Sequence, residues 1–367
     1  MIKLNQIKEM FHIMDSVTPN MKKAFKAIIT ENRKNIFKYV NIAKRYKESC
    51  LIREKLKNEE NIIVPPIMIL SITSKCNLKC KGCFAYNTGV IDNGKNLLFN
   101  DWKKVIEEAI EIGVFGFLMI GGETFLYENL LELCDMYKDN LFVIFTNGTL
   151  LDKEKINKLK NMSNTVVVIS IEGDNELTDN RRGEKTYNKA LKAFSYLKEN
   201  KIMSGVSITI TTINYKFWMD EKNLDYLIDN GIRLGFFTEY IPLNKKEQEE
   251  FCLDNHQRKI FREKILEYKK NKNMLIIHSP GDEEALGGCV SSGIGFAHIN
   301  PFGNVTPCPV SDVFTHNIKD YTLKECLNSQ LFKDIRNNKK LLENNDSSCS
   351  LYSNKEELNK ILSKNNI

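Results

Sequence analysis

From residue 67 onward, short apolar runs rich in β-branched and aromatic residues alternate with longer stretches of helical periodicity. Apolar runs separated by helices indicate parallel strands that are buried on both faces of a sheet. Six such units favour an α/β fold, a partial (β/α)6 barrel of the TIM type, because a complete barrel needs eight. In this architecture the residues that carry chemistry lie at the carboxyl ends of the strands. The expected strands span residues 67–73, 115–120, 141–145, 166–171, 206–212 and 234–239.

Composition divides the chain into three expected parts. Residues 1–66 have helical periodicity and end at two prolines, which terminate helices. Residues 67–278 contain the alternating units and form the expected barrel core. Residues 279–367 begin with a stretch rich in Gly, Pro and Cys, continue with a helical stretch over 323–342, and form a small α+β extension.

Positive charge is concentrated at the N-terminus. Residues 1–60 contain 14 Lys or Arg and 7 Asp or Glu, whereas the whole chain carries a formal net charge of +6. The remainder of the chain is therefore close to neutral, and no nucleic-acid partner is expected. The N-terminal charges either form the solvated face of a helical flap or belong to a basic amphipathic element that contacts a lipid surface or an acidic substrate.

The ten cysteines of the chain are expected to stay reduced. No apolar run is long enough to cross a bilayer, and the first residues lack the apolar stretch of a secretory signal. These features predict a cytoplasmic protein. In that compartment clustered cysteines are more often metal ligands or catalytic groups than disulfides.

Three cysteines follow the first expected strand with the spacing C-x3-C-x2-C, namely Cys76, Cys80 and Cys83. Three thiolates on one loop can hold three irons of a [4Fe–4S] cube, and the fourth iron is then open to a small chelating molecule. A structural zinc site would instead require four closed ligands. Zinc or chance spacing remains the alternative for the triplet taken alone.

Polar motifs follow the next three expected strands. The second strand ends in MIGGETF, where two glycines let the backbone approach a ligand and Glu123 presents a carboxylate. The third ends in FTNGTL, whose Asn-Gly pair is also an ordinary turn signal. The fourth ends in VISIEG, and alternation along the strand points Ser170 and Glu172 into the same site.

These motifs, in this order, resemble the radical S-adenosylmethionine (SAM) superfamily over roughly residues 67–350. In that family a [4Fe–4S] cluster and SAM together yield a 5′-deoxyadenosyl radical, which abstracts hydrogen from the substrate. The resemblance implies that Cys76, Cys80 and Cys83 bind the cluster. It departs from the family at Gly82, where an aromatic residue is usual, and at Thr124, where a proline usually follows the GGE motif.

The resemblance also implies a set of SAM contacts. Glu123 of the GGE motif would bind the methionine amino group, Arg182 would pair with the carboxylate, and the backbone at Phe84 would lie near the adenine. A surface salt bridge is the alternative for Arg182, and its neighbour Arg181 is easily confused with it. The residues expected to bind SAM are Phe84, Gly121, Gly122, Glu123, Thr146, Asn147, Ser170, Glu172, Arg182 and Asn214. No catalytic residue is assigned. Glu239 and Tyr240 end the sixth expected strand, where they either face the substrate or, for Glu239, form a buried carboxylate that backbone groups satisfy.

The C-terminal cysteines predict a second metal centre. Cys289 and Cys308 flank a Gly-containing hairpin, an arrangement similar to the opening of the SPASM or shorter twitch extension of radical SAM enzymes. SPASM domains continue with a dense run of cysteines, whereas only Cys349 follows at a comparable place, so one auxiliary [4Fe–4S] cluster on these three is expected. Cys326 is better interpreted as a core residue of a helix. Zinc, or no metal, is the alternative for the C-terminal set.

The resemblance implies an oxygen-sensitive enzyme whose substrate is a peptide or protein, because family members with this extension often act in maturation. The alternatives are a radical SAM enzyme for a lipid, small molecule or cofactor precursor, and a non-catalytic iron–sulfur electron carrier or scaffold. A flavodoxin- or ferredoxin-type reductant is the other implied partner.

Overall fold

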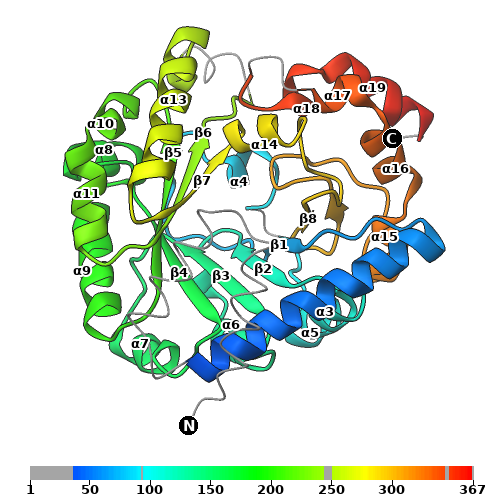
Figure 1. The fold of residues 1–367 in the computed structure, drawn as a ribbon, viewed down its shortest axis with the longest axis horizontal. Helices are drawn as coiled ribbons and strands as arrows, with labels where there is room; N and C mark the ends of the chain where they lie inside the picture. Colours follow the sequence, from blue (N-terminus) through cyan, green and yellow to red (C-terminus); the bar gives the residue numbers. More distant parts are fainter. Residues whose placement is uncertain (1–35, 92–93, 244–249, 344–346, 366–367) are drawn as a thin grey trace.

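The computed structural model describes residues 36–91, 94–243, 250–343 and 347–365. Its centre is one curved sheet of nine strands in the order β7-β6-β5-β4-β3-β2-β1-β8-β9, in which every neighbouring pair is parallel except β8 and β9. The helices that connect the core strands lie on the outer side of the sheet (Figure 1). The expected α/β partial barrel is therefore confirmed.

The six expected strands are present with ends shifted by no more than two residues. They are β1 (Ile67–Ser71), β2 (Gly116–Ile120), β3 (Leu141–Thr146), β4 (Thr165–Ser170), β5 (Ser204–Ile210) and β6 (Leu234–Glu239). The sheet also contains β7 (Leu275–Ser279), which was not expected, and β8 (Phe296–Ile299) and β9 (Val305–Thr306), which pair as the hairpin expected between Cys289 and Cys308. Because β8 pairs in parallel with β1, the beginning of the expected extension continues the sheet of the core.

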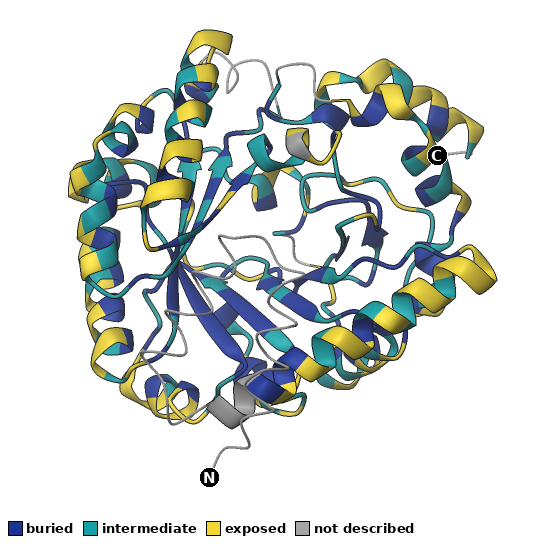
Figure 2. Cartoon of the chain, viewed as in Figure 1, coloured by how far each residue is buried: buried dark blue, intermediate teal, exposed yellow. Residues whose placement is uncertain are grey.

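Amphipathic helices cover the sheet. In α5 (Phe99–Glu111) the buried residues Trp102, Val105, Ile106 and Ala109 recur at helical spacing and face the strands. Figure 2 shows the same division for the other peripheral helices, whose outer faces are exposed. The remaining core helices are η2 (Thr124–Leu126), α6 (Leu130–Asp135), α7 (Lys153–Leu159), α8 (Asn175–Arg182), α9 (Thr186–Glu199), α10 (Tyr215–Met219), α11 (Glu221–Asp229) and α13 (Asn255–Asn271).

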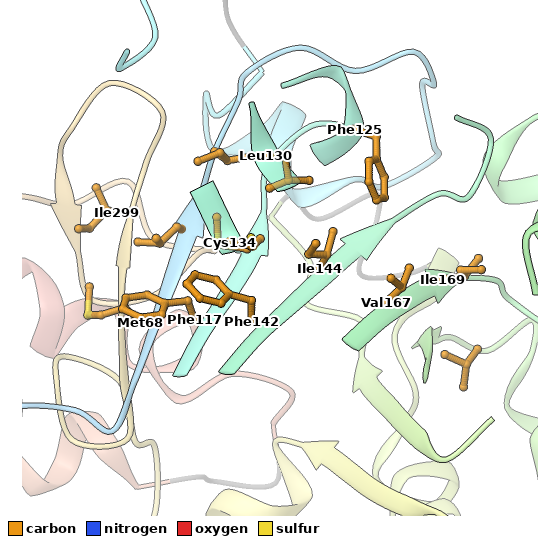
Figure 3. Packing of buried hydrophobic residues seen from close by; sticks show 14 of the residues in the cluster. Met68, Phe117, Phe125, Leu130, Cys134, Phe142, Ile144, Val167, Ile169 and Ile299 are labelled. Carbon is orange, nitrogen blue, oxygen red and sulfur yellow. The ribbon is translucent and has the colours of Figure 1, made fainter. Parts of the chain in front are cut away.

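The main core lies between the sheet and these helices (Figure 3). Phe117 of β2 and Phe142 of β3 stack with ring centroids 5.1 Å apart, and neither side chain is exposed. Cys134 of α6 packs in the same cluster as an ordinary apolar residue. Burying each large side chain contributes about 1.5–3 kcal/mol, so this core holds the strand ends in fixed positions.

The described part of the N-terminal segment is a single helix, α3 (Ile36–Glu60). It packs along α5: Arg45 donates to Ile110 O at 2.6 Å, and Arg53 donates to Gly113 O at 2.5 Å. These basic side chains cap the end of a neighbouring helix, where carbonyl groups lack partners. Residues 1–35, which carry part of the expected basic element, lie outside the described residues.

The last helices of the chain form a small C-terminal layer beyond β8, packed around an apolar cluster of its own (Figure 1). The expected helical stretch over 323–342 is divided into three helices, because Ser329 and Asn338 cap new helix starts with their side chains. The helices after residue 280 are α14 (Gly281–Ala285), which packs against β7, α15 (Leu323–Leu327), which packs against α5, and α16 (Gln330–Asn337), α17 (Lys339–Leu342), α18 (Ser350–Ser353) and α19 (Lys355–Lys364). Among the helices of the described ranges, none combines the length and the apolar character that crossing a membrane requires.

Candidate active site

The cysteine triplet lies in the loop that joins β1 to α4 (Phe84–Asn87), at the carboxyl edge of the sheet. Cys76, Cys80 and Cys83 are partly buried, and their thiols lie close enough to interact electrostatically. Burial, together with the neighbouring thiols and Glu123, raises the pKa of Cys76 to about 11. The thiols therefore need a cation to take up the charge of their deprotonated forms.

The donor chemistry of this loop fits an iron–sulfur cluster. In the part of the chain that the structure describes, no group of three or more His, Cys, Asp or Glu side chains is arranged to hold a single metal ion. A four-iron cube instead binds each thiolate to a different iron, so its ligands stay apart. All three thiols are free of disulfide bonds and available as ligands.

The two glycines after β2 bring the GGE turn against the cysteine loop. The N–H of Glu123 donates to the carbonyl oxygen of Lys75 at 2.8 Å. A side chain at position 122 would overlap the Lys75 carbonyl and place its Cβ 3.1 Å from the Cβ of Cys76. Gly121 and Gly122 therefore fix the position of the cysteine loop through backbone contact, in addition to any role toward a ligand.

Glu123 joins the GGE turn to the TNG turn after β3. Its buried carboxylate accepts hydrogen bonds from the Thr146 hydroxyl at 2.6 Å, the Asn147 N–H at 2.8 Å and the Phe125 N–H at 3.1 Å. Burial raises the pKa of Glu123, although these hydrogen bonds act in the opposite direction. The sequence separates the two motifs by more than twenty residues, and the structure joins them through this carboxylate.

Glu172 accepts hydrogen bonds from both arginines of the Arg181-Arg182-Gly183 (RRG) segment. Its Oε1 accepts from Arg181 Nη1 at 2.5 Å and from Arg182 Nε at 2.7 Å, and all three side chains are largely buried. The two guanidinium groups also lower the pKa of the Cys80 thiol, although burial raises it overall. This cluster therefore places positive charge beside the cysteine loop, where thiolates would form.

Asn214 has a positioning role in the loop after β5. Its amide N–H2 donates to the carbonyl oxygens of Glu172 and Thr209, each at 2.9 Å, and its Oδ1 accepts from the Thr211 N–H at 2.8 Å. The indole of Trp218 donates to the same Glu172 carbonyl at 2.9 Å. Asn214 therefore holds the β4 and β5 loops together rather than projecting a free amide into the site.

Two further expected residues lie at the same edge. Phe84 begins α4 directly after Cys83, and Ser170 is the last residue of β4. Both side chains are only partly buried, as expected of positions that border a ligand site.

Glu239 at the end of β6 forms a buried ion-pair cluster. Its carboxylate lies 2.8 Å from Arg258 Nε, 2.7 Å from Arg262 Nε and 3.2 Å from His278 Nε2. Burial favours the neutral acid, but the hydrogen bonds with His278 and Arg262 outweigh it and hold the pKa of Glu239 below its usual range. The sequence offered either a substrate contact or a backbone-satisfied carboxylate at this position, and the structure shows side-chain partners instead.

The C-terminal cysteines converge from three separate segments. Cys289 follows α14, Cys308 follows β9, and Cys349 caps the start of α18. All three border one small apolar cluster, and each interacts electrostatically with at least one of the others. Cys326 lies elsewhere, in the main core, where its charged neighbours are Glu108 and Glu325.

Sequence reasoning missed the pairing of Glu172 with both arginines and the Glu239 cluster. The signal for the first was present, since a buried acid at a strand end is expected to need a cation, and RRG is the nearest basic segment. Nothing local pairs Glu239 with Arg258 or His278, which come from other elements of the fold.

Two family profiles match the chain. One, described as the radical SAM superfamily, matches residues 70–238, and the other, described as an iron–sulfur cluster-binding (SPASM) domain, matches residues 289–351. Together they cover the strand-end site and the C-terminal cysteine set.

Several characterised proteins are similar in sequence. Fe-coproporphyrin III synthase of Methanosarcina barkeri is 32% identical over 154 residues, which are 41% of this chain and 38% of that protein. AdoMet-dependent heme synthase of the same organism is 25% identical over 307 residues, 76% of this chain and 86% of that protein. PqqA peptide cyclase of Bradyrhizobium diazoefficiens is 30% identical over 184 residues, 49% of this chain and 46% of that protein. The matches with the first and third span less than half the length of those proteins.

Two solved structures share the fold. Streptococcus suis SuiB bound to the precursor peptide SuiA superposes with a TM-score of 0.65 at 19% identity, over 82% of this chain and 72% of that one. The enzyme anSMEcpe with bound AdoMet gives a TM-score of 0.59 at 19% identity, over 82% of this chain and 97% of that one.

The fold and the cysteine motifs define a barrel-type iron–sulfur enzyme. The chain belongs to the radical SAM superfamily and carries a C-terminal SPASM iron–sulfur domain. It is a radical SAM enzyme that uses a [4Fe–4S] cluster with SAM and a SPASM auxiliary iron–sulfur cluster.

Proposed function

We propose that Cys76, Cys80 and Cys83 hold the cluster that binds SAM. The observation that carries this assignment is the convergence of the cysteine loop, the GGE turn and the Glu172–arginine cluster at one edge of the sheet. When bound, the cluster supplies the electron that cleaves SAM, and the protein supplies the surrounding dipoles and charges. The three-part division at residues 1–66, 67–278 and 279–367 belongs to the same proposal.

The SAM contacts follow from the same geometry. Glu123 is placed to accept from an amino group, because three protein donors already hold its carboxylate in one orientation. Arg182 is placed to bind a carboxylate, since its bonds to Glu172 use Nε and Nη2 of a guanidinium that has five N–H donors. The remaining proposed contacts are Phe84, Gly121, Gly122, Thr146, Asn147, Ser170 and Glu172, and Asn214 is proposed to position the site through its bonds to backbone groups.

A peptide or protein is the proposed substrate. An open groove of about 910 Å³ lies between the start of α13 and helices α18 and α19, and most of its lining is polar or charged, including Asp254, Asn255, Asn354 and Lys355. Such a lining suits the many hydrogen-bonding groups of a peptide. Cys252 is one of the residues that line the groove. Its sulfur lies 3.7 Å from the carbonyl oxygen of Tyr240, the residue that follows β6. Similarity to a peptide cyclase, and to the fold of an enzyme crystallised with its precursor peptide, supports the same class.

A tetrapyrrole or other cofactor precursor is the second candidate. The match with the heme synthase extends over most of both chains, farther than the match with the peptide cyclase. A macrocycle would require a broad apolar surface, whereas most of the residues that line the groove have polar or charged side chains. The peptide is therefore favoured. A lipid is the third candidate substrate, because the N-terminal segment of the chain is basic. Binding to liposomes that weakens with added salt would support it.

One experiment separates the two leading substrate classes. The anaerobically reconstituted protein is incubated with SAM and a flavodoxin- or ferredoxin-type reductant, the kind of partner expected in a reducing cytoplasm. The amount of 5′-deoxyadenosine formed is then compared between two added substrates, a short peptide encoded beside the gene and Fe-coproporphyrin III. We expect the peptide to raise product formation and to change mass, whereas stimulation by the porphyrin alone would overturn the peptide assignment. The Cys76→Ala, Cys80→Ala, Cys83→Ala variant serves as the inactive control.

A further inference from the structure

The auxiliary site contains three thiols, and a four-iron cube has four corners to fill. Cys289, Cys308 and Cys349 border one apolar cluster in the C-terminal layer, while Cys326 packs in a different cluster. The question is therefore which group near the three thiols faces the fourth iron.

A run of three acids on α14 provides a candidate. Asp282 pairs with Lys269 of α13 and accepts the His278 N–H at 2.9 Å, and Glu284 pairs with Arg262 of α13. The outer two acids thus fasten α14 to α13 and β7. The middle acid, Glu283, is thereby directed to the side of α14 that faces away from α13.

Glu283 faces the cysteines. Its Oε1 accepts from the Ser279 hydroxyl at 2.9 Å, and its carboxylate also interacts with the Val290 N–H and the Cys289 thiol, which itself donates to the Ser291 hydroxyl at 3.3 Å. It lies within electrostatic range of Cys289, Cys308 and Cys349 alike. Within the described ranges, Glu283 forms no ion pair with a basic side chain, in contrast to both of its neighbours.

We propose that the Glu283 carboxylate is the fourth protein ligand of the auxiliary cluster. Burial disfavours the charged forms of the three thiols and of the Glu283 carboxylate, and no basic side chain of the described ranges pairs with Glu283 to offset that cost. Iron supplies the missing positive charge. The hydrogen bonds from Ser279 and Val290 then orient the carboxylate, as partners behind a metal ligand commonly do.

The test uses the full chain with the substitutions Cys76→Ala, Cys80→Ala and Cys83→Ala. Because this variant lacks the ligands of the SAM-binding cluster, its iron signals come from the auxiliary cluster alone. Mössbauer spectra of protein loaded with isotope-enriched iron should show one iron that differs from the other three. Glu283→Cys should keep all four irons and remove that difference. Glu283→Gln should lose one iron on mild oxidation and give the EPR signal of a three-iron cluster, whereas Glu284→Gln, the matched control, should not.

Three outcomes would overturn the proposal. The first is a Glu283→Gln protein that behaves as Glu284→Gln does. The second is a Glu283→Cys protein whose Mössbauer spectrum equals that of the parent, which remains decisive even where the Gln variant folds poorly. The third is a triple cysteine variant (Cys76→Ala, Cys80→Ala, Cys83→Ala) that binds no iron. This result would mean that the C-terminal site holds no cluster, but it would leave the SAM site and the proposed function intact.

Discussion

The ring of Tyr240 lies directly against Gly82, the residue that precedes the third cysteine of the triplet. A Cβ at position 82 would lie 2.8 Å from Cε2 and 2.9 Å from Cζ of this ring, and Gly82 has a φ of +61°. Tyr240 is 4% exposed and packs edge-on against Phe251. Related enzymes usually have an aromatic residue before the third cysteine, and here an aromatic ring from the end of β6 occupies the space beside that position.

We expect Gly82→Ala to reduce the iron bound at the triplet. The added Cβ meets the Tyr240 ring, and the left-handed backbone costs an alanine about 1–2 kcal/mol. The second change, Tyr240→Ala, removes the clash and should restore part of the iron content, leaving only the backbone cost. Iron and sulfide analysis after anaerobic reconstitution measures both effects. Equal iron content in Gly82→Ala and the wild-type protein would show that the ring does not confine this loop.

The iron count distinguishes the two cysteine sets. Two cubes of four predict about eight irons per chain, and the Cys76→Ala, Cys80→Ala, Cys83→Ala variant should retain about four of them. The same variant should lose reductive cleavage of SAM completely, because the remaining cluster lies in the C-terminal layer. Iron analysis and chromatographic detection of 5′-deoxyadenosine check the two halves of this prediction. A wild-type count near four, or cleavage by the variant, would contradict it.

We expect Glu123 both to stabilise the folded site and to bind SAM, and two substitutions separate these roles. Glu123→Ala leaves the Thr146 hydroxyl and the Asn147 N–H without their buried acceptor, which costs about 1–3 kcal/mol for each unsatisfied group. Glu123→Gln keeps an acceptor oxygen but removes the charge that would bind an amino group. We therefore expect weaker SAM binding in both variants, and a large loss of stability in the Ala variant alone. Calorimetric titration with SAM and thermal unfolding provide the readouts, and unchanged SAM affinity in Glu123→Gln would remove Glu123 from the binding site.

Local patterns predicted the core of the fold well, and long-range pairing limited the rest. The strand β4 is a continuous apolar run of valines, and its position was correct within one residue. In contrast, β8 has only four residues within a Gly- and Cys-rich stretch, and it is stabilised by pairing with β1, more than two hundred residues earlier. A single sequence contains no local signal for such a partner. The strand β7 has five residues, and its side chains alternate between buried and more accessible positions.

The site shows the same limit at the level of side chains. The sequence predicted which residues lie at the strand ends, because the motifs follow the strands directly. It did not predict how they pair. Arg182 was expected to bind a ligand carboxylate or to form a surface salt bridge, and it forms a buried ion pair with Glu172. The Asn214 amide donates to backbone carbonyl oxygens. These pairings depend on neighbouring strands that are parallel and in register, which only the folded sheet defines.

A buried histidine should make the stability of the fold depend on pH. His298 of β8 lies between the Ser71 hydroxyl, 2.8 Å from Nε2, and the Thr306 hydroxyl, 2.7 Å from Nδ1. Burial lowers its pKa from an ordinary value of 6.5 to about 3, so the ring stays neutral in the folded protein while it takes up a proton in the unfolded chain. Its contribution to stability is therefore complete above pH 6.5 and is lost as the pH falls toward 3, by about 1.4 kcal/mol for each pH unit. Anaerobic urea unfolding of the wild-type protein and of His298→Gln, compared at about one pH unit above and one below that ordinary value, should show the extra loss in the wild type alone. Parallel pH profiles for the two proteins would mean that His298 does not titrate differently on folding.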